Sequence, residues 1–138
     1  MRKALLQAVY AWLMEGDNPE EVLNDGLDFH AVDPDDRTRA RDVLICIMRD
    51  RSEADGVLDR VLENWSMDRM GQVELAVCYL ALHELRAQSD LPVEVIIDEA
   101  VRLGKEYAGD ESGHFVNGLL DAAARILRPE EMSGRDPA

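Results

Sequence analysis

The chain has 138 residues, of which 46% are hydrophobic, and this size and composition suffice for one compact core. Aromatic residues make up only 5%, whereas Ala, Leu, Val, Glu, Asp and Arg abound, and most of these side chains lose little rotamer freedom in a helix. We therefore expect one all-α domain. The formal net charge of −14 argues against a bulk electrostatic grip on nucleic acid, because phosphates bind where the potential is positive. Any site for a polyanion must be local.

The first predicted helix covers residues 2–15, with apolar residues on one face and Gly16 free to adopt the positive φ of a helix end. Its basic start and short apolar run are similar to a signal peptide, but Gln7 interrupts the run and no small-x-small cleavage site follows it. No apolar stretch of the sequence is long enough to span a bilayer. We expect a soluble, cytoplasmic protein.

Charges are unevenly distributed over the next segment. Residues 15–36 carry nine acidic side chains and no basic one, whereas residues 37–51 carry five arginines against two aspartates. The acidic run is interpreted as a solvated face, or alternatively as a docking surface for a basic protein. Asn18-Pro19 and Asp33-Pro34 have the chemistry of helix starts. They predict a short second helix and a longer third helix that ends near Asp50.

Four further helices are predicted. Ser52 can cap the fourth, whose buried stripe is Ala54, Val57, Leu58, Val61, Leu62 and Trp65. The fifth, from Gly71 to Gln88, is apolar almost all round, which is typical of a central helix. Pro92 opens the sixth, and its stripe is Val93, Ile96, Ile97, Ala100, Val101, Gly104 and Tyr107. The seventh, over residues 110–127, buries Phe115, Val116, Leu119, Ala123 and Ile126. Residues 1–129 then form the domain, and residues 130–138 a polar tail.

The sequence lacks a residue set for catalysis. Glu111 and His114 have the i, i+3 spacing of carboxylate-bridged metal sites, but such a site needs a second pair and further carboxylates. Cys46 and Cys78 lie in apolar helical stretches, where buried free thiols are expected. No nucleophile elbow and no glycine-rich phosphate loop is present. We expect no enzyme, no metal and no cofactor.

A set of motifs occurs in a characteristic order: Gln7-Ala-Val-Tyr-Ala-Trp12, Gly71-Gln-Val-Glu-Leu-Ala-Val, His83-Glu-Leu, Asp90-Leu-Pro-Val, Ile97-Asp-Glu-Ala and Phe115-Val-Asn-Gly-Leu-Leu-Asp121. In order and spacing they resemble the bacterial NusB family of transcription antitermination factors. The last motif is the most specific. The resemblance covers nearly the whole chain and is weakest between residues 17 and 36.

The resemblance implies a compact bundle of about seven helices, arranged as two perpendicular three-helix subdomains. It also implies an adaptor that binds boxA-type single-stranded RNA together with NusE, a small-subunit ribosomal protein, and that modifies elongating RNA polymerase, notably on ribosomal RNA operons. The resemblance implies that no membrane is involved and that the chain is a monomer or a homodimer. The chemistry is recognition alone: cations meet phosphates, and bases stack on aromatic rings or bond to polar groups.

The resemblance also implies roles for individual residues. The candidates for RNA binding are Arg2, Lys3, Tyr10, Tyr107, Glu111, Ser112 and His114, and Glu74 is the candidate for contact with NusE. Structural alternatives exist: Tyr10 would cover the edge of the core, Tyr107 would close the stripe of the sixth helix, and Phe115 would be core.

Several positions depart from the family pattern. The family has several arginines before the first helix, where this chain has only Arg2 and Lys3, and a cation is common where His114 stands. An arginine is also common at the place of Tyr79, and Asn at that of Asp98. RNA affinity should therefore be weak with a shallow salt dependence. Three explanations stay open: an upstream start codon, dependence on the partner, or a shift of RNA binding toward arginines such as Arg37 and Arg41. The alternative function is an acidic helical protein-interaction module with weak or lost RNA binding.

Overall fold

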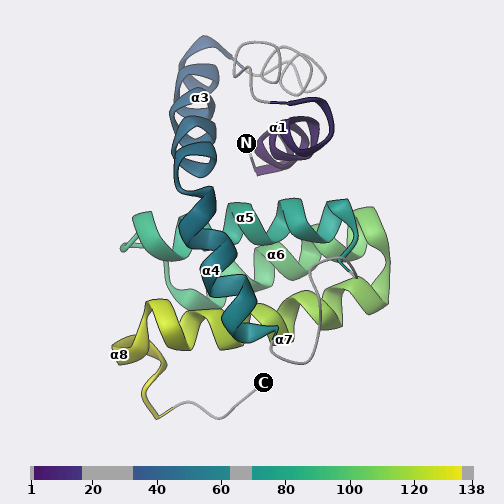
Figure 1. Ribbon diagram of the computed structural model, residues 1–138. Helices are drawn as coiled ribbons and strands as arrows, with labels where there is room; N and C mark the ends of the chain where they lie inside the picture. Colours follow the sequence, from purple (N-terminus) through teal and green to yellow (C-terminus); the bar gives the residue numbers. More distant parts are fainter. Residues whose placement is uncertain (1, 17–32, 63–69, 135–138) are drawn as a thin grey trace. The chain divides into compact units, whose positions relative to one another are not determined.

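The computed structural model describes residues 2–16, 33–62 and 70–134. Throughout these residues the regular elements are α-helices, and no strand occurs among them (Figure 1). This confirms the predicted all-α class. The chain divides into two compact units, Met1–Arg51 and Ser52–Ala138, which we call the N-terminal unit and the C-terminal unit. The extent of a single domain over residues 1–129 stays a prediction.

The N-terminal unit contains α1 (Arg2–Glu15) and α3 (Pro34–Arg49). α1 ends and α3 begins at the residues that the sequence predicted. Gly16 has a φ of +112°, and its N–H donates to the carbonyl oxygen of Trp12 at 3.1 Å. At the start of α3, the Asp33 carboxylate accepts a hydrogen bond from the backbone N–H of Asp36 at 3.0 Å. These ends depend on local chemistry. The predicted second helix falls in residues 17–32, outside the described residues.

The apolar faces of α1 and α3 pack against each other. The buried side chains are Ala4, Leu5, Leu6, Ala8, Val9 and Trp12 of α1 and Ala40, Leu44 and Ile47 of α3. The Arg51 guanidinium lies 5.1 Å from the centroid of the Trp12 ring, which is within the range of a cation–π interaction. This contact ties the C-terminal end of the unit to α1.

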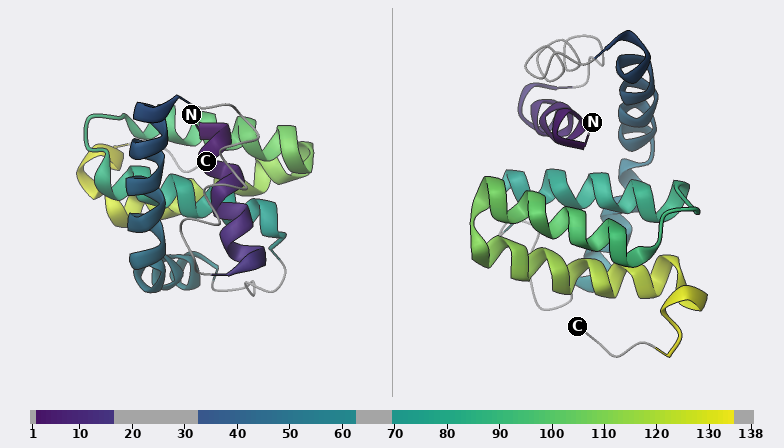
Figure 2. Two further views of the ribbon diagram at one scale, coloured as in Figure 1. Left: turned by 90° about the horizontal axis from the view of Figure 1, so that it is seen from above. Right: turned by 180° about the vertical axis from the view of Figure 1, so that it is seen from behind.

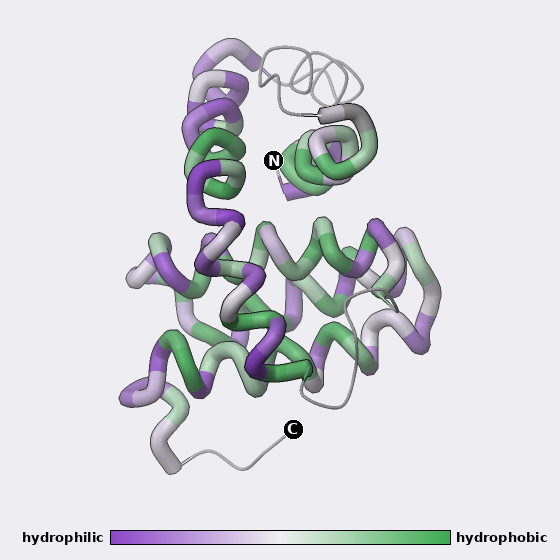
Figure 3. The backbone as a smooth tube through the Cα atoms, in the orientation of Figure 1, coloured by the Kyte–Doolittle hydropathy of each residue, from purple (hydrophilic) through white to green (hydrophobic). Residues whose placement is uncertain are grey.

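The C-terminal unit is built around α5 (Gln72–Ala87), α6 (Val93–Ala108) and α7 (Asp110–Leu127), and each of these helices contacts the other two. Figure 2 shows them lying side by side. α5 is buried from Leu75 to Leu82 without interruption, which confirms the predicted central helix. α6 and α7 each carry both hydrophilic and hydrophobic residues along their length (Figure 3). None of the described helices is both long and apolar enough to cross a membrane.

The predicted stripes of α6 and α7 are mostly confirmed, with differences at their edges. Leu103 and Leu120 are buried although the predicted stripes omitted them. Tyr107 is 39% exposed and does not close the core at the end of α6. Phe115 and Ile126 are only half-buried. The helical spacing thus predicted which face of each helix is buried, but it did not predict every residue of that face.

Polar contacts tie α4 (Arg51–Val61) to α5. The Tyr79 hydroxyl donates to the Asp55 carboxylate, and the Arg86 guanidinium donates to the Glu53 carboxylate. Ala54 and Leu58 provide the buried apolar positions of α4. The predicted stripe continued to Trp65, which lies in residues 63–69, outside the described residues.

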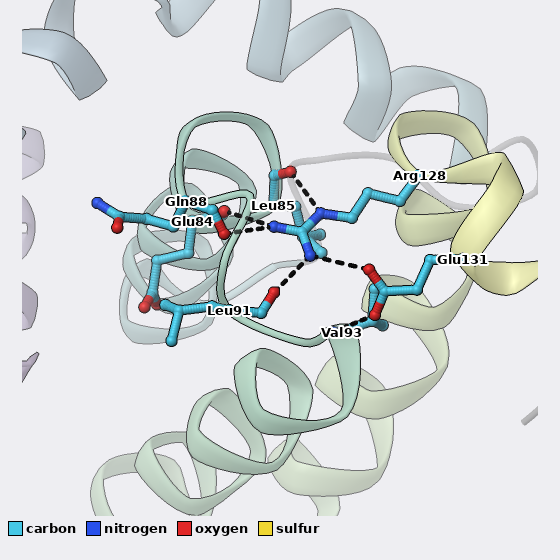
Figure 4. Close-up of polar contacts among 7 residues, drawn as sticks. All are labelled: Glu84, Leu85, Gln88, Leu91, Val93, Arg128 and Glu131. Carbon is cyan, nitrogen blue, oxygen red and sulfur yellow. Dashed lines mark hydrogen bonds and ion pairs between the residues drawn. The ribbon is translucent and has the colours of Figure 1, made fainter.

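The predicted polar tail was wrong for its first residues. Pro129–Met132 forms a short helix, α8, and Met132 is buried. The side chain of Arg128, just before α8, reaches the loop between α5 and α6 (Figure 4). It donates to the carbonyl oxygens of Glu84, Leu85, Gln88 and Leu91 and to the carboxylate of Glu131.

Glu131 completes this arrangement from the other side. Its second carboxylate oxygen accepts a hydrogen bond from the backbone N–H of Val93, the first residue of α6, at 2.7 Å. Carbonyls at a helix C-terminus and amides at a helix N-terminus lack partners within their own helix. Arg128 donates to carbonyls at the end of α5, of which that of Glu84 also accepts from the backbone N–H of Gln88, and Glu131 accepts from the first amide of α6. We call this pair and its backbone partners the C-terminal clasp.

Candidate nucleic-acid interface

One face of α1 in the N-terminal unit combines a cation with an exposed aromatic ring. Lys3, Gln7, Tyr10 and Met14 follow the i, i+4, i+7, i+11 spacing that places side chains on one helix face. Tyr10 is 39% exposed and Met14 is 57% exposed. Arg2 is half-buried, whereas Lys3 is exposed. This face offers a ring for stacking, a hydroxyl and a positive charge.

A second exposed face of the same unit lies on α3. Arg37, Arg41, Ile45 and Arg49 follow each other at four-residue intervals, and all four are exposed. The Arg49 guanidinium donates to the Asp50 carboxylate at 3.1 Å, and that contact raises the pKa of Arg49. Its charge is therefore partly compensated locally. The face agrees with the open alternative that RNA binding has shifted toward Arg37 and Arg41.

In the C-terminal unit, the predicted residues gather where α6 ends and α7 begins. Gly109 has a φ of +94°, which favours glycine, and it joins the two helices without a side chain that could cap α7. Tyr107 before it is exposed, as are Glu111 and His114 after it. These three side chains therefore lie on an accessible segment.

Ser112 differs from its predicted companions. It is only 5% exposed, and its hydroxyl has no hydrogen-bond partner among the described residues. The hydroxyl oxygen lies 3.5 Å from the place that a Cβ on Gly104 would occupy, so it faces α6. Ser112 thus lies beneath the segment that carries Glu111 and His114. The burial of Ser112 could not be predicted from residue spacing, because the serine occupies the polar first turn of α7.

Glu74, the predicted contact with the partner, has a local role in the structure. Its carboxylate accepts a hydrogen bond from the backbone N–H of Gly71 at 3.0 Å, which is the glutamate half of a capping box at the start of α5, since Gly71 has no side chain to complete it. The side chain is half-buried. If Glu74 contacts another protein, its carboxylate must either keep the hydrogen bond to the Gly71 N–H or give it up for the new contact.

The remaining polar chemistry of the described residues gives no second site. No group of three or more His, Cys, Asp or Glu side chains in them is placed to hold a metal ion. Burial raises the pKa of the Cys78 thiol to about 12, so this cysteine is a protonated core residue. Cys46 is a half-buried free thiol. The residue that the sequence analysis overlooked is Lys105, an exposed cation two residues before Tyr107.

A family model described as the NusB family matches residues 1–125 of the chain. The chain belongs to the NusB family. This confirms the resemblance seen in the motifs. The family match ends before Arg128, so the two side chains of the C-terminal clasp, Arg128 and Glu131, lie beyond it, whereas their backbone partners lie within it.

Individual members of the NusB family are similar over nearly the whole chain. A transcription antitermination protein NusB from Acetivibrio thermocellus is 32% identical over 125 residues, which are 91% of this chain and 86% of the relative. The solved structure of T. maritima NusB superimposes with a TM-score of 0.83 at 34% identity, covering 95% of this chain and 93% of that one.

A third similar structure contains other molecules. It is a crystal structure of antitermination factors NusB and NusE in complex with double-stranded RNA, with a TM-score of 0.81 at 27% identity, covering 91% of this chain and 93% of that chain. The NusB fold of that complex is therefore shared by nearly all of this chain. The particular residues predicted to touch RNA or NusE stay predictions.

Proposed function

We propose that this chain is a transcription antitermination factor that acts as a non-catalytic adaptor, binding RNA together with NusE. The observation that carries the proposal is membership of the NusB family over residues 1–125. The similar structure of NusB and NusE with RNA supports the choice of partners. The function consists of recognition, and no bond is made or broken.

The proposed RNA is single-stranded and of the boxA type. Tyr10 and Tyr107 are each 39% exposed, so both rings are accessible for base stacking. Arg2 and Lys3 supply cations for phosphates, and Glu111 and His114 supply polar groups. Ser112 is buried, and its proposed role is to support the segment that carries Glu111 and His114. The RNA in the similar complex is double-stranded, so strandedness belongs in the test.

The proposed protein partner is NusE, and the assembly acts in the cytoplasm on elongating RNA polymerase, notably on ribosomal RNA operons. The formal charge of −14 suits a basic protein partner better than it suits RNA alone. We therefore expect the partner to raise RNA affinity, because it adds positive potential to the complex. Glu74 is the proposed contact on α5.

The test is a fluorescence anisotropy titration of labelled boxA-like RNA with the chain, with and without NusE. A scrambled single strand and a duplex of the same length are the RNA controls. Tyr10→Ala should weaken binding about tenfold, since stacking of one base contributes roughly 1–3 kcal/mol. Met14→Ala is the matched control, because Met14 lies on the same face of α1 and is more exposed. Absence of any RNA binding in either condition at low salt would refute RNA recognition.

A second candidate function is an acidic protein-interaction module that keeps the NusB fold and has lost RNA. The observation in its favour is the charge balance: the chain has 29 acidic against 15 basic residues. It predicts that NusE binds with unchanged affinity whether or not RNA is present. It also predicts that the chain gives no change in the anisotropy of labelled RNA, with or without NusE, so the same titration separates the two functions.

A further inference from the structure

We propose that Lys105 is the phosphate-binding cation of the C-terminal unit, held in position by Gly113. This inference rests on the proposed RNA-binding function and adds a residue that neither the family motifs nor the sequence analysis assigned. α6 and α7 approach each other closely at two glycines, Gly104 and Gly113.

Gly104 and Gly113 add no side chains of their own where α6 and α7 approach each other, so side chains of the neighbouring helix lie directly against them. A Cβ placed on Gly104 would be 3.5 Å from both the Ser112 hydroxyl oxygen and a Val116 methyl group, which is ordinary contact. A Cβ placed on Gly113 would be 2.6 Å from Cγ, 3.2 Å from Cδ and 2.8 Å from Cε of Lys105. The aliphatic stem of Lys105 therefore occupies the space that any other residue at position 113 would fill.

This seat, the contact with Gly113, restricts the stem of a lysine that is nevertheless exposed. Lys105 is exposed as a residue although three of its side-chain carbons lie on Gly113. Long cationic side chains commonly bury their stem and expose their charge. Because the stem is already ordered, less side-chain entropy is lost when the ammonium group binds a ligand. A seated lysine is thus better prepared for a phosphate than a lysine that is free to rotate.

Lys105 supplies a positive charge that the other proposed RNA-binding residues of the C-terminal unit lack. Tyr107, Glu111, Ser112 and His114 include no permanently cationic side chain, although binding of an RNA backbone needs one. Between residues 103 and 115 the sequence has one Lys or Arg, Lys105, against three acidic residues. Within the described part of the chain, Lys105 takes part in no ion pair. Its charge is therefore available for a phosphate.

The test compares Lys105→Met, Lys105→Arg and Gly113→Ala in the RNA titration with NusE, repeated over a range of salt concentrations. Lys105→Met keeps an apolar stem on Gly113 and removes the charge. The slope of log K against log[salt] is negative, and loss of one phosphate contact should reduce its magnitude by about 0.7 for a single strand. The loss of affinity should be the same for boxA-like and scrambled RNA, because a phosphate carries no sequence information. Lys105→Arg should restore the slope.

Gly113→Ala tests the seat itself. The new methyl group must displace the lysine stem, so RNA affinity should fall while the charge of the protein is unchanged. Arg102→Gln is the matched control, because Arg102 is an exposed cation one turn earlier on α6, paired with Glu99 at 3.4 Å. It should leave the salt slope unaltered. Circular dichroism of each variant checks that the fold is intact.

The outcomes are distinguishable. A wild-type salt slope in Lys105→Met, with RNA binding intact, overturns the inference and leaves the proposed function standing. A loss of NusE binding in Lys105→Met without any change in RNA binding also overturns it, because the residue would then belong to a protein interface. Absence of RNA binding by the wild-type protein overturns the inference and the RNA function together.

Discussion

Removing the Arg128 side chain should destabilise the C-terminal unit by about 3 kcal/mol. The guanidinium contacts four backbone carbonyl oxygens and one carboxylate, and its side chain is only 10% exposed. A hydrogen bond to a charged group contributes roughly 1.5–3 kcal/mol, but these five contacts share one cation and cannot be summed. Loss of one partner of a buried pair costs about 3–5 kcal/mol. The lower end of that range applies because water can reach part of the loop.

The assay is urea denaturation of Arg128→Ala followed by circular dichroism. The midpoint should fall while the dependence of the unfolding free energy on urea stays the same. Arg128→Lys should recover only a small part of the loss, because an ammonium group cannot reach four carbonyls in the fixed fork geometry of a guanidinium. Arg102→Ala is the control, and it should change the unfolding free energy by less than about 0.5 kcal/mol, since its ion pair is exposed.

An equal midpoint for Arg128→Ala and Arg102→Ala would refute this reasoning. It would mean that water replaces the guanidinium at the α5 carbonyls without loss. A change in the urea dependence of the unfolding free energy would indicate that α8 separates from the rest of the unit before global unfolding, and the energy would then have to be divided between two transitions.

Further changes test single contacts elsewhere in the fold. Tyr79→Phe should cost about 1–2 kcal/mol of unfolding free energy, measured by urea denaturation, because Asp55 loses its buried donor. Asp33→Ala should cost about 1 kcal/mol in the same assay, since α3 loses its N-cap. A thiol reagent at pH 8 should modify Cys46 and spare Cys78 in the native protein, and both should react in denaturant. The raised pKa of Cys78 means that its neutral form is favoured by folding, so stability should fall as the pH rises from about 9 to about 12.

Helix ends that depend on neighbouring residues could be predicted from the sequence. Gly16 ends α1, Asp33 caps α3, and α7 has the bounds 110–127 that were expected. In each case the deciding groups lie within four residues of the helix end. Local propensity and capping are therefore sufficient information for these boundaries.

The C-terminal clasp could not be predicted in this way, because its partners lie 37 to 44 residues apart in the sequence. Arg128 follows Ile126 and Leu127 and precedes Pro129, and nothing near it in the sequence indicates which carbonyls it binds. Met132 likewise looked like part of a polar tail, although its side chain is buried. Both depend on tertiary packing, which overrides local pattern.

The candidate site was predictable in its location but not in its details. The motif around Phe115 placed the RNA-binding prediction at the start of α7, where Glu111 and His114 are exposed. That Ser112 is buried, and that Lys105 lies on Gly113, depends on how closely α6 and α7 approach each other. Helix-to-helix distance is a property of packing, which residue spacing along one helix does not report.

The position of Arg128 also has a consequence for biosynthesis. The ribosome adds this arginine 44 residues after Glu84, whose carbonyl it binds. While a nascent chain is still being extended, α5 has therefore been made but the carbonyls at its end lack the guanidinium of Arg128. The N-terminal unit is complete long before that moment, in keeping with the order in which units fold during synthesis. Closure of the C-terminal unit therefore requires a segment made long after α5, and a chain truncated before Arg128 would have an α5 whose C-terminal carbonyls lack this donor.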